Sequence, residues 1–345
     1  MANIVAFLVV LGVLVSFHEF GHLIVAKACN IKIDSYSVGF GPVLAKFKFG
    51  ETEYRLSLIP LGGYVKPAGP NFRDDVNPDD PEKERYLVSA PTWKRASMIA
   101  AGPFFNLLLA FLMVTGVVYY HGSIVVLSGK IGEVAANSPA SKAGLLKGDV
   151  IKAVNGEEVG EWMDALIPIQ ESNGREIKFT VEREGVILDI KIVPETKENR
   201  FFVGIGPVIE EKKINGFGAV QEGVLAVHDG ISLQAVGMWH ILTGKLSTKN
   251  LGGPIMIYQE TGKAAKAGFS ALFSLTVMLS IALGFFNLLP IPILDGGHLL
   301  MMGLEGVFGN FSKEAHTLFQ QVGMVLILFI FCFAIYNDIS RLRTK

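Results

Sequence analysis

Five consecutive residues, His18-Glu19-Phe20-Gly21-His22, have the types and the spacing of a metal site. Two histidines four residues apart lie on one face of a helix, where both can bind one zinc ion. The glutamate between them can act as a general base toward a water molecule that the zinc polarises. Catalytic zinc usually takes three protein ligands, so another part of the chain must supply the third.

The surrounding segment places this site inside an apolar helix. The stretch from Ile4 to Phe17 carries no charge, and apolar residues resume from Leu23 to Ala26. As a helix, the first stretch rises ~21 Å against a hydrocarbon core of about 30 Å. His18 is therefore expected within the bilayer, where ionisable side chains are costly and usually functional.

Composition assigns the chain to the integral membrane proteins. Half of its 345 residues are hydrophobic, the mean hydropathy is +0.42, and the formal net charge of −1 gives no global field that would attract nucleic acid. Four stretches are long and apolar enough to span a membrane. They are approximately Asn3–Ala28, Ser97–Tyr120, Phe269–Pro290 and Val322–Tyr336 with its flanks.

The distribution of positive charge predicts the orientation. No Lys or Arg precedes the first span, whereas the loop between the first two spans is rich in both and ends with Lys94 and Arg95. Cytoplasmic loops carry such an excess, so this loop is expected inside and the N-terminus outside. Four spans then put residues 121–268 and the C-terminus outside.

The segment from Tyr36 to Lys66 has the alternation of a β-hairpin. Phe47 and Phe49 precede Gly50-Glu51, and the alternating residues Tyr54, Leu56 and Leu58 follow. Pro60, Gly62 and Gly63 are expected to end it. The acidic stretch from Asn71 to Arg85 is expected to be a loose loop.

Residues of about 128–208 combine turn signals with short β-rich runs and predict a small soluble domain. Ile177–Val181 and Ile187–Val193 are expected strands, and a helix is expected near Trp162–Gln170. The following stretch, Gly216–Ser247, is apolar in a helical rhythm but carries His228 and His240. It predicts one or two helices on the membrane surface, with both histidines at the interface and not at a metal.

The third zinc ligand is expected where the helix of the third span is interrupted. Pro290 and Pro292 interrupt the helix, and an unwound segment at membrane depth is tolerated when it lines a cavity or is buried in protein. Asp295 and His298 follow, and chemistry alone does not decide between them. The second span contains Asn106, whose buried amide needs hydrogen-bond partners. Its role is either a contact between helices or a contact with the substrate.

Taken together, these residues resemble the site-2 protease family of intramembrane zinc metalloproteases, in particular the bacterial regulator-of-sigma-E protease group. The resemblance is carried by His18-Glu19-Phe20-Gly21-His22, by Gly102-Pro-Phe-Phe-Asn106 and by Leu294-Asp295-Gly296. The stretch from Ser138 to Asn155 looks like a PDZ domain. The chain has room for one such domain, whereas the best-known Gram-negative members have two.

The resemblance implies roles for individual residues. His18, His22 and Asp295 would bind Zn²⁺, which favours Asp295 over His298, and Glu19 would be the catalytic base. Asn106 would help to hold the substrate. The segment Gly39-Phe40-Gly41 would belong to a membrane-associated β-loop that takes up the substrate as an added strand.

The fold expected from residues and resemblance is an α-helical integral membrane protein with four transmembrane helices, a membrane-associated β-hairpin and an inserted β-rich PDZ-like domain. Its parts are the first two transmembrane helices and the hairpin loop (1–120), the PDZ-like extracytoplasmic domain (121–210), interfacial amphipathic helices (211–267) and the last two transmembrane helices (268–345). It implies a multi-pass protein of the bacterial cytoplasmic (inner) membrane. It also implies a zinc endopeptidase that cleaves transmembrane segments of single-span membrane proteins, such as anti-sigma factors or signal-peptide remnants.

A different class of function remains an alternative. A non-proteolytic membrane receptor or scaffold could bind peptide C-termini through the PDZ-like domain and keep zinc structurally. Structural zinc sites are closed by four protein ligands, usually with cysteines, and Cys29 and Cys332 form no such cluster in the sequence. Glu19 also favours catalysis.

Overall fold

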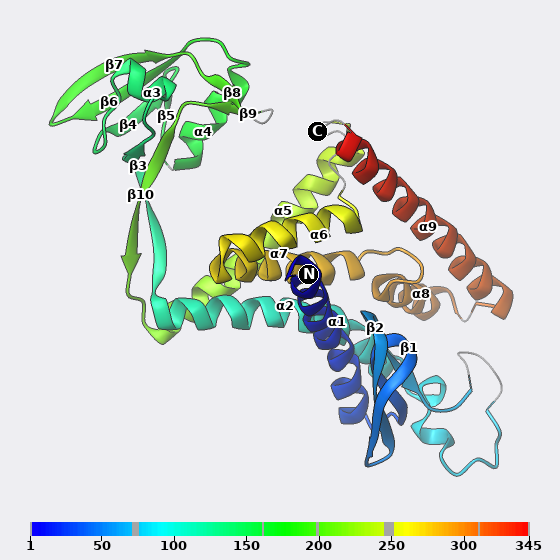
Figure 1. Cartoon of the computed structure of the whole chain (residues 1–345). Coiled ribbons are helices and arrows are strands. Elements are labelled where there is room, and N and C mark those ends of the chain that lie inside the picture. The colour runs from blue at the N-terminus through cyan, green and yellow to red at the C-terminus, as the bar shows by residue number, and fades with distance from the viewer. Residues whose placement is uncertain are drawn as a thin grey trace. The chain divides into compact units, whose positions relative to one another are not determined.

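The computed structural model describes residues 2–70, 76–160, 162–197, 200–244, 252–309 and 311–343. The chain forms two compact units, one made of Met1–Gly116 with Val220–Lys345 and the other of Val117–Ala219. In the first unit the elements are α1 (Ala2–Ala28), β1 (Ile33–Phe49), β2 (Thr52–Pro67), the 3-10 turns η1 (Lys83–Arg85) and η2 (Leu87–Ser89), α2 (Thr92–His121, which runs on into the second unit), α5 (Gly216–Leu242, which begins there), α6 (Pro254–Ala267), α7 (Phe269–Asn287), α8 (Asp295–Phe308) and α9 (Lys313–Arg343) (Figure 1).

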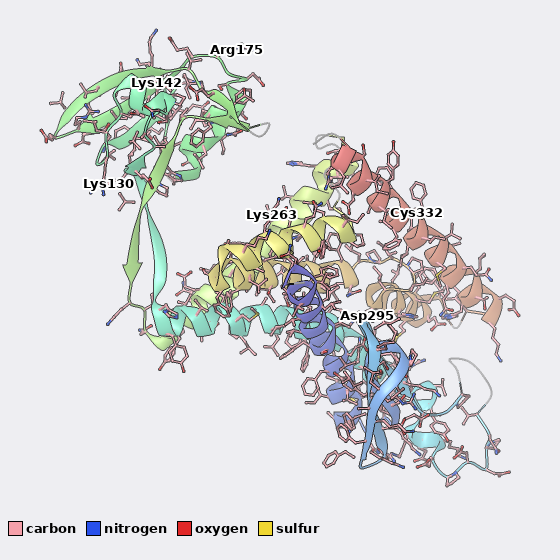
Figure 2. All side chains as sticks on the ribbon, viewed as in Figure 1. Lys130, Lys142, Arg175, Lys263, Asp295 and Cys332 are labelled. Carbon is pink, nitrogen blue, oxygen red and sulfur yellow. The ribbon has the colours of Figure 1, made fainter. Side chains whose placement is uncertain are left out.

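Among the described residues, four helices are long and apolar enough to cross a membrane, as the sequence predicts. They are α1, α2, α7 and α9. The fourth candidate span, Lys313–Leu342, is longer than the predicted Val322–Tyr336. Its added flanks carry polar residues that weaken a hydropathy signal without disfavouring a helix. Cys332 lies on α9 (Figure 2), and its side chain is exposed.

Helix α1 packs against three other helices. Val10 and Leu14 form a buried cluster with Leu109 of α2, and side chains of α7 pack against this cluster. Helix α6 lies against the N-terminal part of α1, where a Cβ on Gly262 would come within 2.8 Å of the side chain of Asn3. The first unit is therefore assembled around α1, the helix that carries the histidines.

The C-terminal part of α9 contacts the first turn of α6 through the side chain of Asp338. Asp338 accepts hydrogen bonds from the backbone N–H groups of Gly253, Ile255 and Met256 at 3.0–3.1 Å. The first N–H groups of a helix have no partner within it, and a carboxylate there satisfies them and complements the helix dipole. Helix α6 is thus in contact with residues near both ends of the chain.

The predicted hairpin is confirmed, with its turn at residues 50–51 between β1 and β2. However, β2 does not end at Pro60, Gly62 and Gly63, because it continues to Pro67. Residues 33–38 pair with 63–67 on one side, and 35–38 pair with 53–56 on the other, so the first part of β1 lies between two parts of β2. The two glycines allow this return, because a Cβ on Gly62 would collide with the ring of Phe40, and one on Gly63 would lie 2.6 Å from the carbonyl oxygen of Ser37.

The expected loop is confirmed from residue 76 to the short 3-10 turn η1, while 71–75 lie outside the described residues, but side-chain contacts anchor the loop, which corrects the expectation that it is loose. Tyr86 is 8% exposed and donates a hydrogen bond of 2.6 Å to Asp80. Arg85 binds both carboxylate oxygens of Glu51 in the hairpin turn. These long-range partners leave no trace in the local composition.

The second unit is β-rich, as predicted. Its elements are β3 (Ser123–Val134), α3 (Pro139–Ala143), β4 (Val150–Val154), β5 (Glu157–Glu158), α4 (Trp162–Glu171), β6 (Ile177–Arg183), β7 (Val186–Ile192), β8 (Glu195–Lys197), β9 (Arg200–Phe202) and β10 (Ile205–Lys212). The main sheet has the order β10-β3-β4-β6-β7, with β5 paired to β4 and a separate β8-β9 pair. Its core is built on Phe179, Ile151 and Ile131, and α4 covers the expected helix near Trp162–Gln170.

Candidate metal centre

The two histidines of α1 point their Nε2 atoms at a common position. His18 and His22 are one helical turn apart, and their Nε2 atoms are 3.3 Å from each other. Both side chains are about nine-tenths buried, with 11% and 12% exposure. Two imidazoles from one helix therefore present two nitrogen donors to one buried point.

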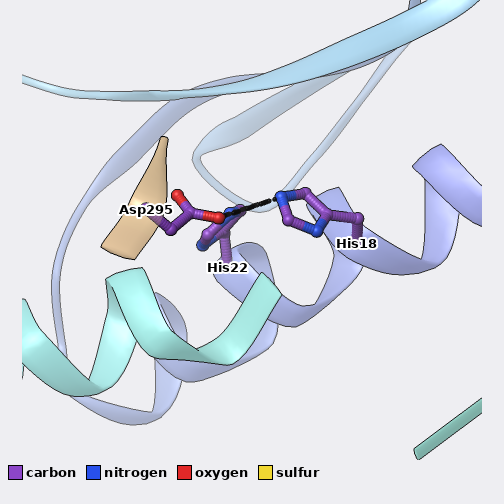
Figure 3. A group of neighbouring side chains, drawn as sticks. All are labelled: His18, His22 and Asp295. Carbon is purple, nitrogen blue, oxygen red and sulfur yellow. Dashed lines mark hydrogen bonds and ion pairs between the residues drawn. The ribbon is translucent and has the colours of Figure 1, made fainter. Parts of the chain in front are cut away.

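Asp295 brings a third donor to the same point, and His298 does not. The Oδ2 atom of Asp295 lies 3.2 Å from Nε2 of His18 and 3.7 Å from Nε2 of His22 (Figure 3). Among the described residues, these three make the one group of His, Cys, Asp or Glu side chains whose donor atoms could share a metal ion. His228 is exposed and pairs with Asp229, and neither it nor His240 joins the group.

Asp295 reaches this position because the chain unwinds between α7 and α8, as the two prolines predict. The N–H of Leu294 donates to the carbonyl of Ile291, which closes a turn over Pro292 and Ile293. Ile293 has a φ of +80°, in the left-handed region that a β-branched residue rarely adopts. This is a type II turn with isoleucine where glycine is normally found.

Two glycines after Asp295 allow the first turn of α8 to lie close to the unwound segment. A Cβ on Gly296 would come within 2.3 Å of the carbonyl oxygens of Leu288 and Leu289. One on Gly297 would come within 2.2 Å of the carbonyl oxygen of Ile291. Any larger residue at Gly296 or Gly297 would push α8 away from the unwound segment and displace the Asp295 carboxylate.

Helix α2 supports both histidines from a single face. Met98, Gly102 and Asn106 follow one another at intervals of four residues and therefore lie on one side of the helix. The carbonyl oxygen of Met98 is 2.8 Å from Nδ1 of His22, and Nδ2 of Asn106 is 3.1 Å from Nδ1 of His18. Gly102 lies between them, and a Cβ there would be 2.3 Å from Nε2 of His22.

Glu19 lies between the ligands and the sheet. Its Cγ atom is 3.0 Å from the position that a Cβ on Gly63 would take, so β2 passes directly beside it. The backbone N–H of Val65 faces the Glu19 carboxylate. On the same strand pair, the hydroxyl of Tyr36 donates a hydrogen bond of 3.1 Å to the carbonyl of Ser16 in α1. The expected base is thus held next to the expected ligands by an edge of the hairpin sheet.

The donor set suits a zinc ion. Oδ2 of Asp295 is buried and has no hydrogen-bond partner. Leaving a buried carboxylate oxygen unpaired is costly, and a cation at this point would remove that cost. Two imidazole nitrogens and one carboxylate oxygen are a known ligand set of catalytic zinc, in which a further position stays open.

The residues predicted to bind substrate lie in two places, Asn106 beside His18 and residues 39–41 in the hairpin sheet. Asn106 is fully buried and contacts His18, while its Oδ1 atom has no partner. Gly39 and Gly41 have φ values of +92° and +82°, and Phe40 stacks on the ring of Tyr64 at 6.3 Å within the sheet. Sequence reasoning missed Met98, since a backbone carbonyl has no signature in the residue type.

Comparisons with known proteins agree on one family. The profile of peptidase family M50 matches residues 6–330. A protein of Agrobacterium fabrum named among the zinc metalloproteases is 35% identical, over 98% of this chain and 96% of its own length. The zinc metalloprotease RasP of Oceanobacillus iheyensis is 30% identical, over 99% of this chain and 100% of its own length. The chain therefore belongs to peptidase family M50, the site-2 protease family of zinc-dependent membrane metalloproteases.

Proposed function

We propose that the protein is an intramembrane endopeptidase that cleaves transmembrane segments of single-span membrane proteins. The observation that carries this proposal is the convergence of Asp295 with His18 and His22, which lie with Glu19 in a candidate span. A soluble zinc peptidase tethered to a membrane would not need its ligands inside an apolar helix. The proposal assigns zinc binding to the three convergent side chains and the base to Glu19.

When bound, zinc supplies a Lewis acid that polarises water and the carbonyl of the scissile peptide bond. The Glu19 carboxylate takes a proton from the attacking water, whose oxygen forms a bond to the carbonyl carbon. The carbon–nitrogen bond then breaks, and Glu19 gives the proton to the leaving amine nitrogen. His18, His22 and Asp295 hold their donor atoms in place throughout.

A transmembrane helix must unwind before it is cut, because its backbone groups are paired with one another. The hairpin sheet offers backbone groups next to Glu19, and Gly39, Phe40 and Gly41 belong to it. An extended substrate can be bound as an added strand on such a sheet. Phe40 is 44% exposed and would contact the substrate there, and we assign the side-chain amide of Asn106 to a second substrate contact.

The orientation follows from the charges and from α6. The N-terminus, the second unit and the C-terminus are assigned to the outer side of the bacterial cytoplasmic membrane, and helices α5 and α6 to its surface. Contacts of α6 with Asn3 and with Asp338 support chain ends on one side, which an even number of spans requires. Cysteines introduced at exposed Lys147 and Asp79, in a chain without Cys29 and Cys332, test this. An impermeant thiol reagent should label only the first in spheroplasts, and the opposite labelling would invert the topology.

The second unit is assigned a PDZ-like role, in which it binds peptide C-termini and regulates access to the site. Residues 128–208 contain no histidine, so no imidazole ligand or base can come from there. Replacing them by a short linker should preserve cleavage of a truncated substrate and relax discrimination against its full-length form. Complete loss of activity in a folded, zinc-loaded deletion variant would contradict this role.

Zinc content combined with a cleavage assay distinguishes the peptidase from the non-proteolytic receptor. The purified protein in detergent should contain one zinc and cut a reporter carrying a single transmembrane segment. Removal of zinc by a chelator should abolish cleavage, and added zinc should restore it. A zinc-loaded protein that binds reporters but cuts none of a broad panel would favour the receptor.

A further inference from the structure

We propose that Asn106 is a positioning residue that holds His18 in the tautomer able to bind zinc. The inference rests on the proposed zinc site and adds a role for Asn106 that is separate from substrate contact. Its basis is the 3.1 Å contact between the Asn106 side chain and Nδ1 of His18. Asn106 is fully buried, and the side chain of His18 is 11% exposed.

A histidine that binds zinc through Nε2 carries its proton on Nδ1, and the acceptor of that proton fixes the ring. For His22 the acceptor is the carbonyl of Met98, at 2.8 Å from Nδ1. For His18 the neighbour of Nδ1 is the Asn106 amide. The Nδ1 atom of each histidine thus faces a polar group on the same face of α2.

The orientation of the amide determines what it can do. In the present arrangement Nδ2 of Asn106 faces Nδ1 of His18, and Oδ1 has no partner. Nδ2 can only donate, which suits a His18 whose proton is on Nε2 and whose Nδ1 carries the lone pair. A half-turn of the amide exchanges the two atoms within the same space. Oδ1 then accepts from Nδ1–H of His18, and Nε2 presents its lone pair to the metal.

The backbone of Asn106 is itself fixed. Ser280 of α7 donates a hydrogen bond of 2.7 Å to the carbonyl oxygen of Asn106, and Ser280 is fully buried. The contact therefore links α7, α2 and the first zinc ligand in one chain of hydrogen bonds. After the half-turn, Nδ2 is the atom left free, and it remains a donor for the proposed substrate contact.

Two substitutions of similar volume distinguish a role of Asn106 as a hydrogen-bond acceptor from a role in packing alone. Asn106→Asp keeps an oxygen toward His18, whereas Asn106→Leu fills the space without any acceptor. The loss of an outer-shell partner of a zinc-bound histidine typically costs 10–100-fold in metal affinity. We expect this loss for Asn106→Leu, and we expect Asn106→Asp to stay within about twofold of the wild type or to bind more tightly, since carboxylate–histidine pairs are common at zinc sites.

The experiment is a competition between the purified full-length protein and a chelator of known zinc affinity. Thr276→Val serves as a control, because Thr276 is nearly buried and donates only to Leu272 of its own helix. The control should bind zinc as the wild type does. The visible spectrum of the cobalt-substituted protein should change in Asn106→Leu and not in Asn106→Asp.

Equal zinc affinity in wild type and Asn106→Leu would overturn the inference, as would equal losses in the Leu and Asp variants. Failure of the zinc site itself has a different signature. In that case the wild type would bind no stoichiometric zinc, or Asp295→Ala would bind it as well as the wild type. An increased KM in Asn106→Asp at unchanged zinc affinity would show the positioning and substrate roles acting through different atoms of one amide.

Discussion

Met98 accepts a hydrogen bond from Nδ1–H of His22 through its backbone carbonyl oxygen, across 2.8 Å. The acceptor is part of the main chain, so the orientation of this ligand does not depend on the side chain at position 98. Pro103 lies in the same helix and cannot donate to the carbonyl of Ile99. Helix α2 thus combines an irregular hydrogen-bond ladder with contacts to both histidines of the proposed zinc site.

The identity of the third ligand can be tested by a pair of substitutions. Asp295→Ala should lower zinc affinity by more than the 10–100-fold typical of outer-shell residues, because it removes a ligand. His298→Ala should change it by less than about twofold, since His298 is outside the convergent group. Metal analysis after dialysis against a chelator measures both variants. The reverse ranking would overturn the assignment of Asp295.

Gly102 should tolerate no side chain. In Gly102→Ala the new Cβ would lie 2.3 Å from Nε2 of His22 and 2.8 Å from Cε1 of His18, so the rings must move apart. We expect severe loss of zinc and of cleavage. Gly116→Ala is the matched control in the same helix, because nothing lies within 4 Å of its Cβ position. It should be neutral or stabilising by up to about 1 kcal/mol. Equal zinc affinity of the two variants would contradict the close contact.

Much of this arrangement is predictable from local sequence, and the exceptions share a cause. The apolar spans, the turn at Gly50-Glu51 and the break at Pro290 and Pro292 depend on composition and backbone chemistry close in sequence. The extension of β2 past Pro60 depends on pairing with residues 33–38, which lie far back in the chain. The support from Met98 involves a backbone atom. Neither long-range pairing nor a main-chain acceptor is encoded by residue type.

The turn before Asp295 should show an unusual preference at Ile293. Ordinarily alanine stabilises a protein relative to glycine, because glycine loses more backbone freedom on folding. At a φ of +80° the order should reverse, with Ile293→Gly more stable than Ile293→Ala by about 1 kcal/mol. Thermal unfolding of the two variants in the same detergent measures this difference. An alanine variant that is the more stable of the two would show that the turn is not left-handed there.

The second unit should lose stability in acid through Asp149. Burial alone would raise the pKa of this carboxyl, but hydrogen bonds from the Arg183 guanidinium and the Leu146 N–H lower it below its usual range. A group with a depressed folded pKa stabilises the fold above its unfolded pKa of about 3.9 and loses that contribution as the pH falls through the folded value. Stability should therefore fall below about pH 4.

Asp149→Asn should cost about 2 kcal/mol at neutral pH, as expected for charged hydrogen bonds, and should weaken the acid dependence. Asp189→Asn is the control on the same sheet, since its ion pair with Lys178 is half exposed and should contribute less than about 1 kcal/mol. Hydrogen exchange of residues 117–219 in the full-length protein reports both effects. Identical acid dependence in Asp149→Asn and wild type would exclude Asp149 as the cause.

Glu19→Gln tests most directly whether Glu19 is the base of a zinc peptidase acting on membrane spans. The variant and the wild type are purified, their zinc is measured, and both are given the same reporter carrying one transmembrane segment. Glutamine keeps the size of the side chain and removes the basic oxygen. The variant should retain one zinc and lose about 10²–10⁴-fold in cleavage rate, the usual contribution of a general base. Cleavage at near wild-type rate by a folded, zinc-loaded Glu19→Gln protein would contradict the account.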